Sequence, residues 1–190
     1  GEGGGGDVGT ETLALGFGTE ADTAAALGEA QGALTAGFEN VRSGYVRSWT
    51  EYLADRDVPE SVADDPGLKR QYDAALMTLR ACEDKRHRGA SVASPSVPWG
   101  EAVVAGEERG YGYNFVWSRD LYQVATAHLA AGDVETPADA LAYVYRRQQD
   151  ERGFIPQNTY LDGQTRWGGE QMDNISYPAV LAYLLHEAGV

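Results

Sequence analysis

The sequence has one cysteine, Cys82, and two lysines, Lys69 and Lys85. A single cysteine excludes an internal disulfide, and its place on the apolar side of an expected helix predicts a small core residue. No apolar run is long enough to span a bilayer, and the first residues carry no basic-then-apolar signal pattern. The formal charge of −14 argues against nucleic acid and anionic membranes as partners, because binding phosphates needs a basic face.

The sequence also carries few residues that suggest a metal site or a cofactor. His87 and His186 have no companions at metal-ligand spacing, so no metal site and no cofactor are expected. Asp162-Gly163 is typical of a turn rather than of a calcium loop, and calcium is not otherwise indicated. His128 lies on the apolar side of an expected helix and is interpreted as a core histidine. The 190 residues, 43% of them hydrophobic, suffice for one sizeable domain, or for a small one with a piece of another.

The N-terminal segment predicts the end of a β domain. From Thr10 to Gly18 the residues alternate, with Leu13, Leu15 and Phe17 on one side, as in a half-buried strand. A strand needs neighbours for its backbone groups, and no other convincing strand of this length follows. Residues 1–18 are therefore expected to close a domain that begins upstream, with the glycine-rich run at 3–6 as a loop.

A long amphipathic helix is predicted next. Thr19 and Asp22 form a capping pattern, and apolar residues then recur at helical spacing to about Ala54. Its glycines weaken it, so it must rely on tertiary packing. Residues 19–64 are expected to be a linker helix and a connection.

Four further helices are predicted in residues 65–190, from apolar periodicity and from proline, capping and glycine signals at their ends. Their expected limits are Asp65-Pro66 to about Asp84, about Ser118 to Gly132, Thr136-Pro137 to Gly153, and Asp173 or Asn174 to Gly189, with Pro178 in the first turn of the last.

The connections between these helices place two loops together. A few residues, Asp133 to Glu135, join the second and third of these helices, which makes them antiparallel neighbours. The connections before and after this pair are much longer. If neighbouring helices alternate in direction, both long loops open at one end of the bundle. Loops of this length in a compact domain are uncommon unless they have a function.

The two long loops carry the candidate site residues. Aromatic rings beside fixed hydrogen-bonding groups suit a ligand with apolar faces and a rim of hydroxyls, and a sugar is the commonest such ligand. Two simpler interpretations remain open, namely core rings at a helix start, and an ion pair or cap formed by Arg119 and Asp120. The residues expected to face one another across a cleft are Tyr113, Trp117, Arg119 and Asp120 from one loop and Trp167, Gln171 and Asp173 from the other.

The order and spacing of the motifs resemble the glucoamylase, glucodextranase and related trehalase family of inverting glycoside hydrolases. The resemblance covers the chain from about Pro66 to its end, and residues 10–53 resemble the end of the β-sandwich and the linker helix that precede the catalytic domain in prokaryotic members. The motifs are Ser94-Pro95-Ser96, Tyr113-Asn114-Phe115-Val116-Trp117-Ser118-Arg119-Asp120, Pro156-Gln157-Asn158 and Trp167-Gly168-Gly169-Glu170-Gln171-Met172-Asp173.

The resemblance implies a mainly α fold, an incomplete (α/α)6 toroid whose first part is residues 65–190, preceded by a β-strand remnant of a β-sandwich and the linker helix. It implies that Arg119 and Asp120 hydrogen-bond the non-reducing-end glucose, that Tyr113 lies against the reacting sugar, and that Trp167 lines the next subsite. Gln171 and Asp173 match the motif and are expected to contact substrate. The toroid is expected to pack on the remainder of its own chain.

The same resemblance implies that the catalytic acid and base are not in this chain. Inverting hydrolysis needs two carboxyl groups, and the family places both glutamates after the last helix predicted here, which puts them C-terminal of Val190. No catalytic residue is therefore expected in residues 1–190, and these residues alone are expected to be inactive. Glu170 is interpreted as a solvated loop carboxylate.

The expected function is part of an exo-acting hydrolase that releases glucose from the non-reducing end of an α-glucan with inversion. The alternatives are a trehalase of the same family and a non-catalytic helical carbohydrate-binding or interaction module. The presence of both glutamates in the stretch that follows Val190 would favour the enzyme, and their absence would favour the module.

Overall fold

The computed structural model describes residues 11–18, 22–95 and 113–190, in two compact units, residues 1–54 and 55–190, which are considered separately. The expected loop at residues 3–6, the capping role of Thr19, and Ser96 in the first motif fall outside the described residues. No helix among the described residues combines the length and the apolar character that crossing a membrane requires.

The first unit contains two helices where one long helix was predicted. Helix α1 spans Thr23–Ala36 and helix α2 spans Phe38–Ala54. Asp22 caps α1, since its carboxylate accepts a hydrogen bond from the backbone N–H of Ala25 at 3.2 Å. Gly37 separates the helices with a φ of 82°, a left-handed conformation that ends a helix and that glycine adopts without steric cost. The prediction of a single continuous helix was therefore wrong at Gly37.

Residues 11–18 form no strand in the described structure, although their alternation predicts one. A strand is held by backbone hydrogen bonds to a neighbouring strand, and none of the described strands pairs with this segment. Leu13, Leu15 and Phe17, which were expected on a half-buried face, are 84%, 71% and 78% exposed. The periodicity identified the apolar side of the segment, but not a partner to cover it.

The second unit confirms the four predicted helices and adds one short helix. Asp65 caps α4 as expected, accepting hydrogen bonds from the N–H groups of Gly67 and Leu68. The four-residue helix was not predicted, because it is too short to show a period. The π-helical turn lies within the helix that was predicted to end at Gly153, and only its change from α to π geometry was not predicted. The elements are α3 (Glu60–Ala63), α4 (Pro66–Ala81), α5 (Ser118–Ala130), α6 (Glu135–Tyr143), the π-helical η1 (Val144–Gln148) and α7 (Met172–Glu187).

Three details of these helices differ from prediction. The helix expected to reach Gly153 ends at Gln148. Helix α6 begins at Glu135, and Thr136, expected as its cap, is instead inside the helix, where its N–H donates to Asp133. Pro178 lies in the second turn of α7 rather than the first. A proline there removes one backbone hydrogen bond of the helix, so α7 depends more on packing than its length implies.

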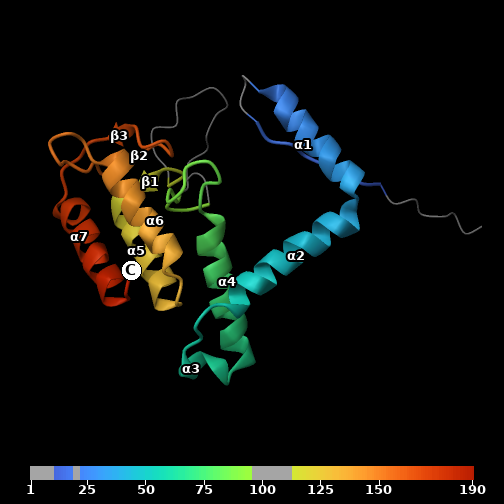
Figure 1. Ribbon diagram of the computed structural model, residues 1–190, viewed down its shortest axis with the longest axis horizontal. Coiled ribbons are helices and arrows are strands. Elements are labelled where there is room, and N and C mark those ends of the chain that lie inside the picture. The colour runs from blue at the N-terminus through green and yellow to red at the C-terminus, as the bar shows by residue number, and fades with distance from the viewer. Residues whose placement is uncertain (1–10, 19–21, 96–112) are drawn as a thin grey trace, which may run out of the picture. The chain divides into compact units, whose positions relative to one another are not determined.

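The core of the second unit lies between α5, α6 and α7, which pack on one another (Figure 1). Cys82 is buried at the end of α4, as expected. The buried hydrophobic residues of the core cluster are Ala90, Val116, Leu121, Ala125, Ala140, Tyr143, Val144, Ile155, Leu181 and Leu185.

Three short antiparallel strands lie at one end of these helices (Figure 1). They are β1 (Val116–Trp117), β2 (Asn158–Thr159) and β3 (Thr165–Trp167), with β2 in the middle. The turn between β2 and β3 contains Asp162-Gly163, as predicted, and Gly163 has a φ of 93°. Because β1 leads into α5 and β3 leads towards α7, this sheet brings the two long loops to the same end of the bundle, which is the arrangement that the connection lengths predict.

Candidate functional site

Three aromatic rings from the two loops lie together at this end of the bundle. The strand register pairs the backbone of Asn158 with both Trp117 and Trp167, one on each side. The two indoles meet edge to face with ring centroids 5.9 Å apart, and Tyr113 stacks on Trp117 at 5.2 Å. Trp167 is 47% exposed, so a ligand can reach this group of rings, which we call the aromatic cluster.

Arg119 connects the same two loops through charge. It stands in the first turn of α5, and its Nε donates a hydrogen bond to the carboxylate of Asp173 in the first turn of α7. Its Nη2 donates to Oε1 of Gln171, the N-cap residue of α7, at 2.6 Å. The bond to Asp173 raises the pKa of Arg119, which keeps the guanidinium charged. The structure thus brings together three of the predicted site residues from separate loops.

Asp120 follows Arg119 in the first turn of α5 and is half-buried. Burial raises the pKa of its carboxyl group, and this effect is opposed by the residue's own backbone N–H and by Arg119. The site therefore presents a positive group with several donors and a carboxylate acceptor within two consecutive residues, in the first turn of the helix whose N-cap residue is Trp117.

A second set of contacts holds the site elements in register, and sequence reasoning missed it. The hydroxyl of Ser118 donates to the carbonyl of Pro156 at 2.8 Å, which ties the start of α5 to the second loop. One turn inward from Arg119 and Asp173, Tyr122 of α5 and Tyr177 of α7 stack with centroids 4.3 Å apart. Their helical spacing from the predicted site residues is the signal that identifies them.

Polar contacts also hold the buried side of the hairpin formed by β2 and β3. The hydroxyl of Tyr143 donates to the carbonyl of Tyr160 at 3.0 Å, and Nε2 of Gln148 donates to the hydroxyl of Thr159 at the same distance. Burial raises the pKa of Tyr143 to about 12. These bonds fasten the strand β2, and with it the middle of the sheet, to the end of the α6 and η1 helix.

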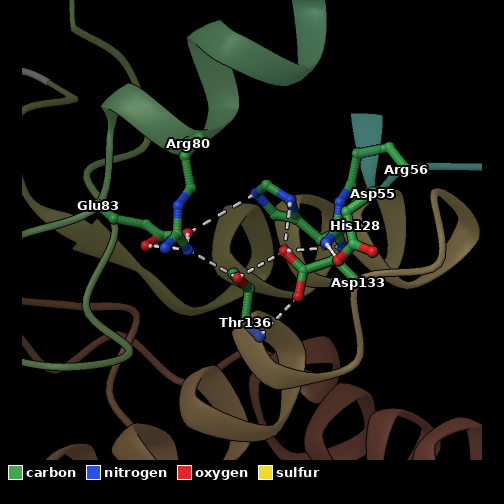
Figure 2. A network of polar contacts seen from close by, with 7 residues as sticks. All are labelled: Asp55, Arg56, Arg80, Glu83, His128, Asp133 and Thr136. Carbon is green, nitrogen blue, oxygen red and sulfur yellow. Dashed lines mark hydrogen bonds and ion pairs between the residues drawn. The ribbon is translucent and has the colours of Figure 1, made fainter. Parts of the chain in front are cut away.

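A separate polar network lies at the other end of α5 (Figure 2). His128 is fully buried, with Nδ1 3.7 Å from Oδ2 of Asp133 and Nε2 3.9 Å from Oε1 of Glu83. Arg80 donates from Nη1 to both Glu83 and Thr136. Burial lowers the pKa of His128 and raises that of Glu83. His128 is a core histidine, as expected, and the network joins α4, α5 and α6 away from the aromatic cluster.

Among the described residues, Glu170 and His87 are two further titratable groups considered for the site. Glu170 is exposed, in keeping with a solvated loop carboxylate. His87 pairs with Asp84 on the loop after α4. In the described ranges, no three His, Cys, Asp or Glu side chains are grouped as metal ligands would be.

The C-terminal end of α7 bears on the expected place of the catalytic glutamates. Val190 lies three residues beyond the end of α7 at Glu187, and its backbone N–H donates to the carbonyl of Leu185 at 3.0 Å, so the last residues still complete the end of this helix. The expectation that the acid and the base lie C-terminal of Val190 concerns residues beyond this point, and it therefore stays a prediction.

Comparisons with known proteins match both units of the chain. Residues 69–151 match the family model of glycosyl hydrolases family 15, and residues 5–54 match the model of glucodextranase, domain N. A glucoamylase of Clostridium sp. (strain G0005) is 38% identical over 153 residues. A crystal structure of a bacterial glucoamylase complexed with acarbose superposes with a TM-score of 0.72 at 34% identity.

These matches confirm the resemblance and the fold class that the motifs predict, with a mainly helical chain that matches part of the (α/α)6 fold of glucoamylase. The match covers 80% of this chain and 20% of the Clostridium protein, and 88% of this chain and 24% of the crystallised one. The chain thus spans about a fifth to a quarter of the relatives it matches.

Proposed function

We propose that this chain is part of an exo-acting glycoside hydrolase of the glucoamylase and glucodextranase type, which releases glucose from the non-reducing end of α-glucans with inversion. The observation that carries the proposal is the meeting of Trp117 and Trp167 beside Arg119 and Asp120, all at one end of the helical bundle. The relative that was crystallised with acarbose supports an oligosaccharide ligand.

The proposed role of the charged residues is to hold the terminal glucose. A sugar hydroxyl can donate to the carboxylate of Asp120 and accept from the guanidinium of Arg119, so one hydroxyl or two neighbouring ones can satisfy both groups. Hydrogen bonds to charged groups are about twice as strong as neutral ones, so such a pair can hold a sugar firmly. Gln171 and Asp173 belong to the same group of residues through their bonds to Arg119.

The proposed role of the aromatic cluster is to bind the apolar faces of the sugar rings. Tyr113 and Trp117 would lie against the reacting sugar, and the half-exposed Trp167 against the next one. The proposal assigns substrate binding to this chain and places the catalytic acid and base C-terminal of Val190. Inverting hydrolysis needs these two carboxyl groups about 6.5 to 9.5 Å apart across the scissile bond.

The test is glucose release by the full-length protein that contains this chain. We expect release from maltose or from isomalto-oligosaccharides, and the first glucose detected by NMR should be the β-anomer, because inversion changes the anomeric configuration. Release from trehalose alone would replace the α-glucan with trehalose as substrate. Inactivity on all three would contradict the proposal.

Two alanine variants test the assignment of the pocket. Arg119→Ala and Asp120→Ala should each lower kcat/KM at least about 100-fold, because each removes a hydrogen bond between a charged group and the reacting sugar. Arg88→Ala is the matched control, since Arg88 is also an exposed arginine in an ion pair, but its partner is Asp139 of α6. Near-normal activity of either site variant would show that the pocket is wrongly assigned.

A further inference from the structure

We infer that Asp173 and Gln171 are positioning residues that orient the guanidinium of Arg119, and that neither binds the sugar itself. The inference rests on the proposed function and refines it, because both residues were expected to contact substrate on the strength of their motif. It changes the list of groups that touch the sugar and assigns a separate task to the start of α7.

The hydrogen bonds to Arg119 occupy one edge of its guanidinium. Asp173 accepts from Nε, and Gln171 accepts from Nη2, so the two acceptors lie side by side along the edge that these nitrogens form. A guanidinium has five N–H donors in a fixed plane. The two contacts therefore fix its orientation and leave three donors, including both on Nη1, for other partners.

Exposure separates Arg119, which meets the ligand, from Asp173, which holds it. The side chain of Arg119 is 48% exposed, whereas that of Asp173 is 20% exposed. The second carboxylate oxygen of Asp173, Oδ1, is buried and has no hydrogen-bond partner in the described part of the chain. A sugar hydroxyl cannot reach Oδ1 without a rearrangement, and Oδ2 is already engaged with Arg119.

The two acceptors are also carried by a rigid element. Gln171 stands at the N-cap position of α7 and Asp173 lies in its first turn. One turn further along, the stack of Tyr122 on Tyr177 joins α7 to α5, the helix that carries Arg119. Groups that orient a binding residue work best when packed helices hold them, because small displacements of the binding group are costly.

A double-mutant cycle in the full-length protein tests this inference. Asp173→Ala should lower kcat/KM on maltose about 10- to 100-fold, with most of the loss in kcat if the orientation of Arg119 matters in the transition state. In an Arg119→Ala background the same change should cost less than about twofold, because the group on which Asp173 acts is gone. Equal losses in both backgrounds would mean that Asp173 binds the sugar directly and would overturn the inference.

Conservative variants supply a second measurement. Asp173→Asn keeps an acceptor but loses the charge, so its loss should be smaller than that of Asp173→Ala, and it replaces the alanine variant in the cycle if that one does not fold. Gln171→Glu should restore part of the activity of Asp173→Asn, because a carboxylate again accepts from the guanidinium. Absence of any rescue would contradict a shared role in holding Arg119.

A structural readout separates this inference from the proposed function. In crystal structures of the full-length protein, the guanidinium of Arg119 should leave its position in Asp173→Ala and keep it in the wild type, whether or not the protein releases glucose. An unmoved guanidinium would overturn the positioning role even if the protein hydrolyses α-glucans. Inactivity of the wild type with a displaced guanidinium in the variant would instead contradict only the proposed function.

Discussion

Trp117 and Trp167 stand edge to face at 5.9 Å although a whole helical hairpin separates them in the chain. Their backbones pair with the same residue, Asn158, from opposite sides of the middle strand. The sheet, rather than direct packing of the loops, therefore determines where the two indoles meet.

Replacing Trp167 tests the role of the exposed ring. Trp167→Ala should raise KM for maltose and longer oligosaccharides about 10-fold or more, because stacking of a flat ligand face on an aromatic ring contributes on the order of 1–3 kcal/mol. Trp167→Phe should keep most of the affinity. Steady-state kinetics of the full-length protein measure both, and an unchanged KM in the alanine variant would remove Trp167 from the binding surface.

Two glycines near the β2–β3 hairpin should differ in how well they tolerate replacement by alanine. Gly163 has a φ of 93°, and an added Cβ would lie 2.6 Å from the carbonyl oxygen of Arg147. Gly163→Ala should therefore cost at least about 1–3 kcal/mol and lower activity by moving β3. Gly168→Ala, immediately after β3, meets only Thr165 at 3.8 Å and is the control. Thermal unfolding midpoints of the two variants should differ clearly, and equal midpoints would contradict the turn geometry.

Acid should destabilise the protein through His128. Burial lowers the pKa of His128 below its ordinary value of 6.5, so the unfolded state binds the proton more readily than the folded state. The stability that the neutral ring contributes is complete above pH 6.5 and is lost as the pH falls through the lowered pKa. Arg56, Arg80, Asp133 and Glu83 face the ring.

Glu83 in the same network changes the stability of the protein with pH in the opposite direction. Burial raises its pKa above 4.5, so its contribution is complete below pH 4.5 and is lost as the pH rises through the raised pKa. The measurement must therefore separate the contribution of His128 to stability from that of Glu83. The thermal midpoint of the wild type should fall more between about pH 7 and pH 5 than that of His128→Gln, and identical changes in both would exclude His128 as the source.

The burial of Tyr143 should make the stability of the protein depend on pH in the alkaline range. Its folded-state pKa of about 12 exceeds the ordinary value of 10.0, so the stability it contributes is lost as the pH rises from about 10 towards 12. Tyr143→Phe removes the bond to the carbonyl of Tyr160 and should cost about 1 kcal/mol at neutral pH. The same variant should lose less stability than the wild type between about pH 9 and pH 11, as measured by urea unfolding.

Much of the helical part of the fold was predictable because its signals are local. Asp65 caps α4 where a capping residue followed by proline predicts a start, and Gly132 and Gly189 follow the ends of α5 and α7. The short loop between α5 and α6 fixed their antiparallel packing, and with it the end at which both long loops meet. These features depend on a few neighbouring residues and on chain length, which a sequence displays directly.

The parts that could not be predicted depend on partners that are distant in the chain. Residues 11–18 alternate like a strand, but whether they pair depends on a neighbour rather than on themselves. Gly37 ends α1, whereas Gly28 and Gly32 lie within it, and nothing in the local sequence distinguishes these positions. For the candidate site, the sequence predicted that its two loops meet, but the bonds of Arg119 to Gln171 and Asp173 become visible only in three dimensions.

The central position of β2 makes the spacing of the indoles independent of how long the surrounding loops are. Neighbouring strands lie about 4.8 Å apart whatever connects them. Insertions or exchanges in the connection before β1, or in the hairpin beyond Tyr160, can therefore alter the rim while leaving the two rings at a constant gap. A change within β2 itself would instead displace both indoles together, because both of their strands pair with it.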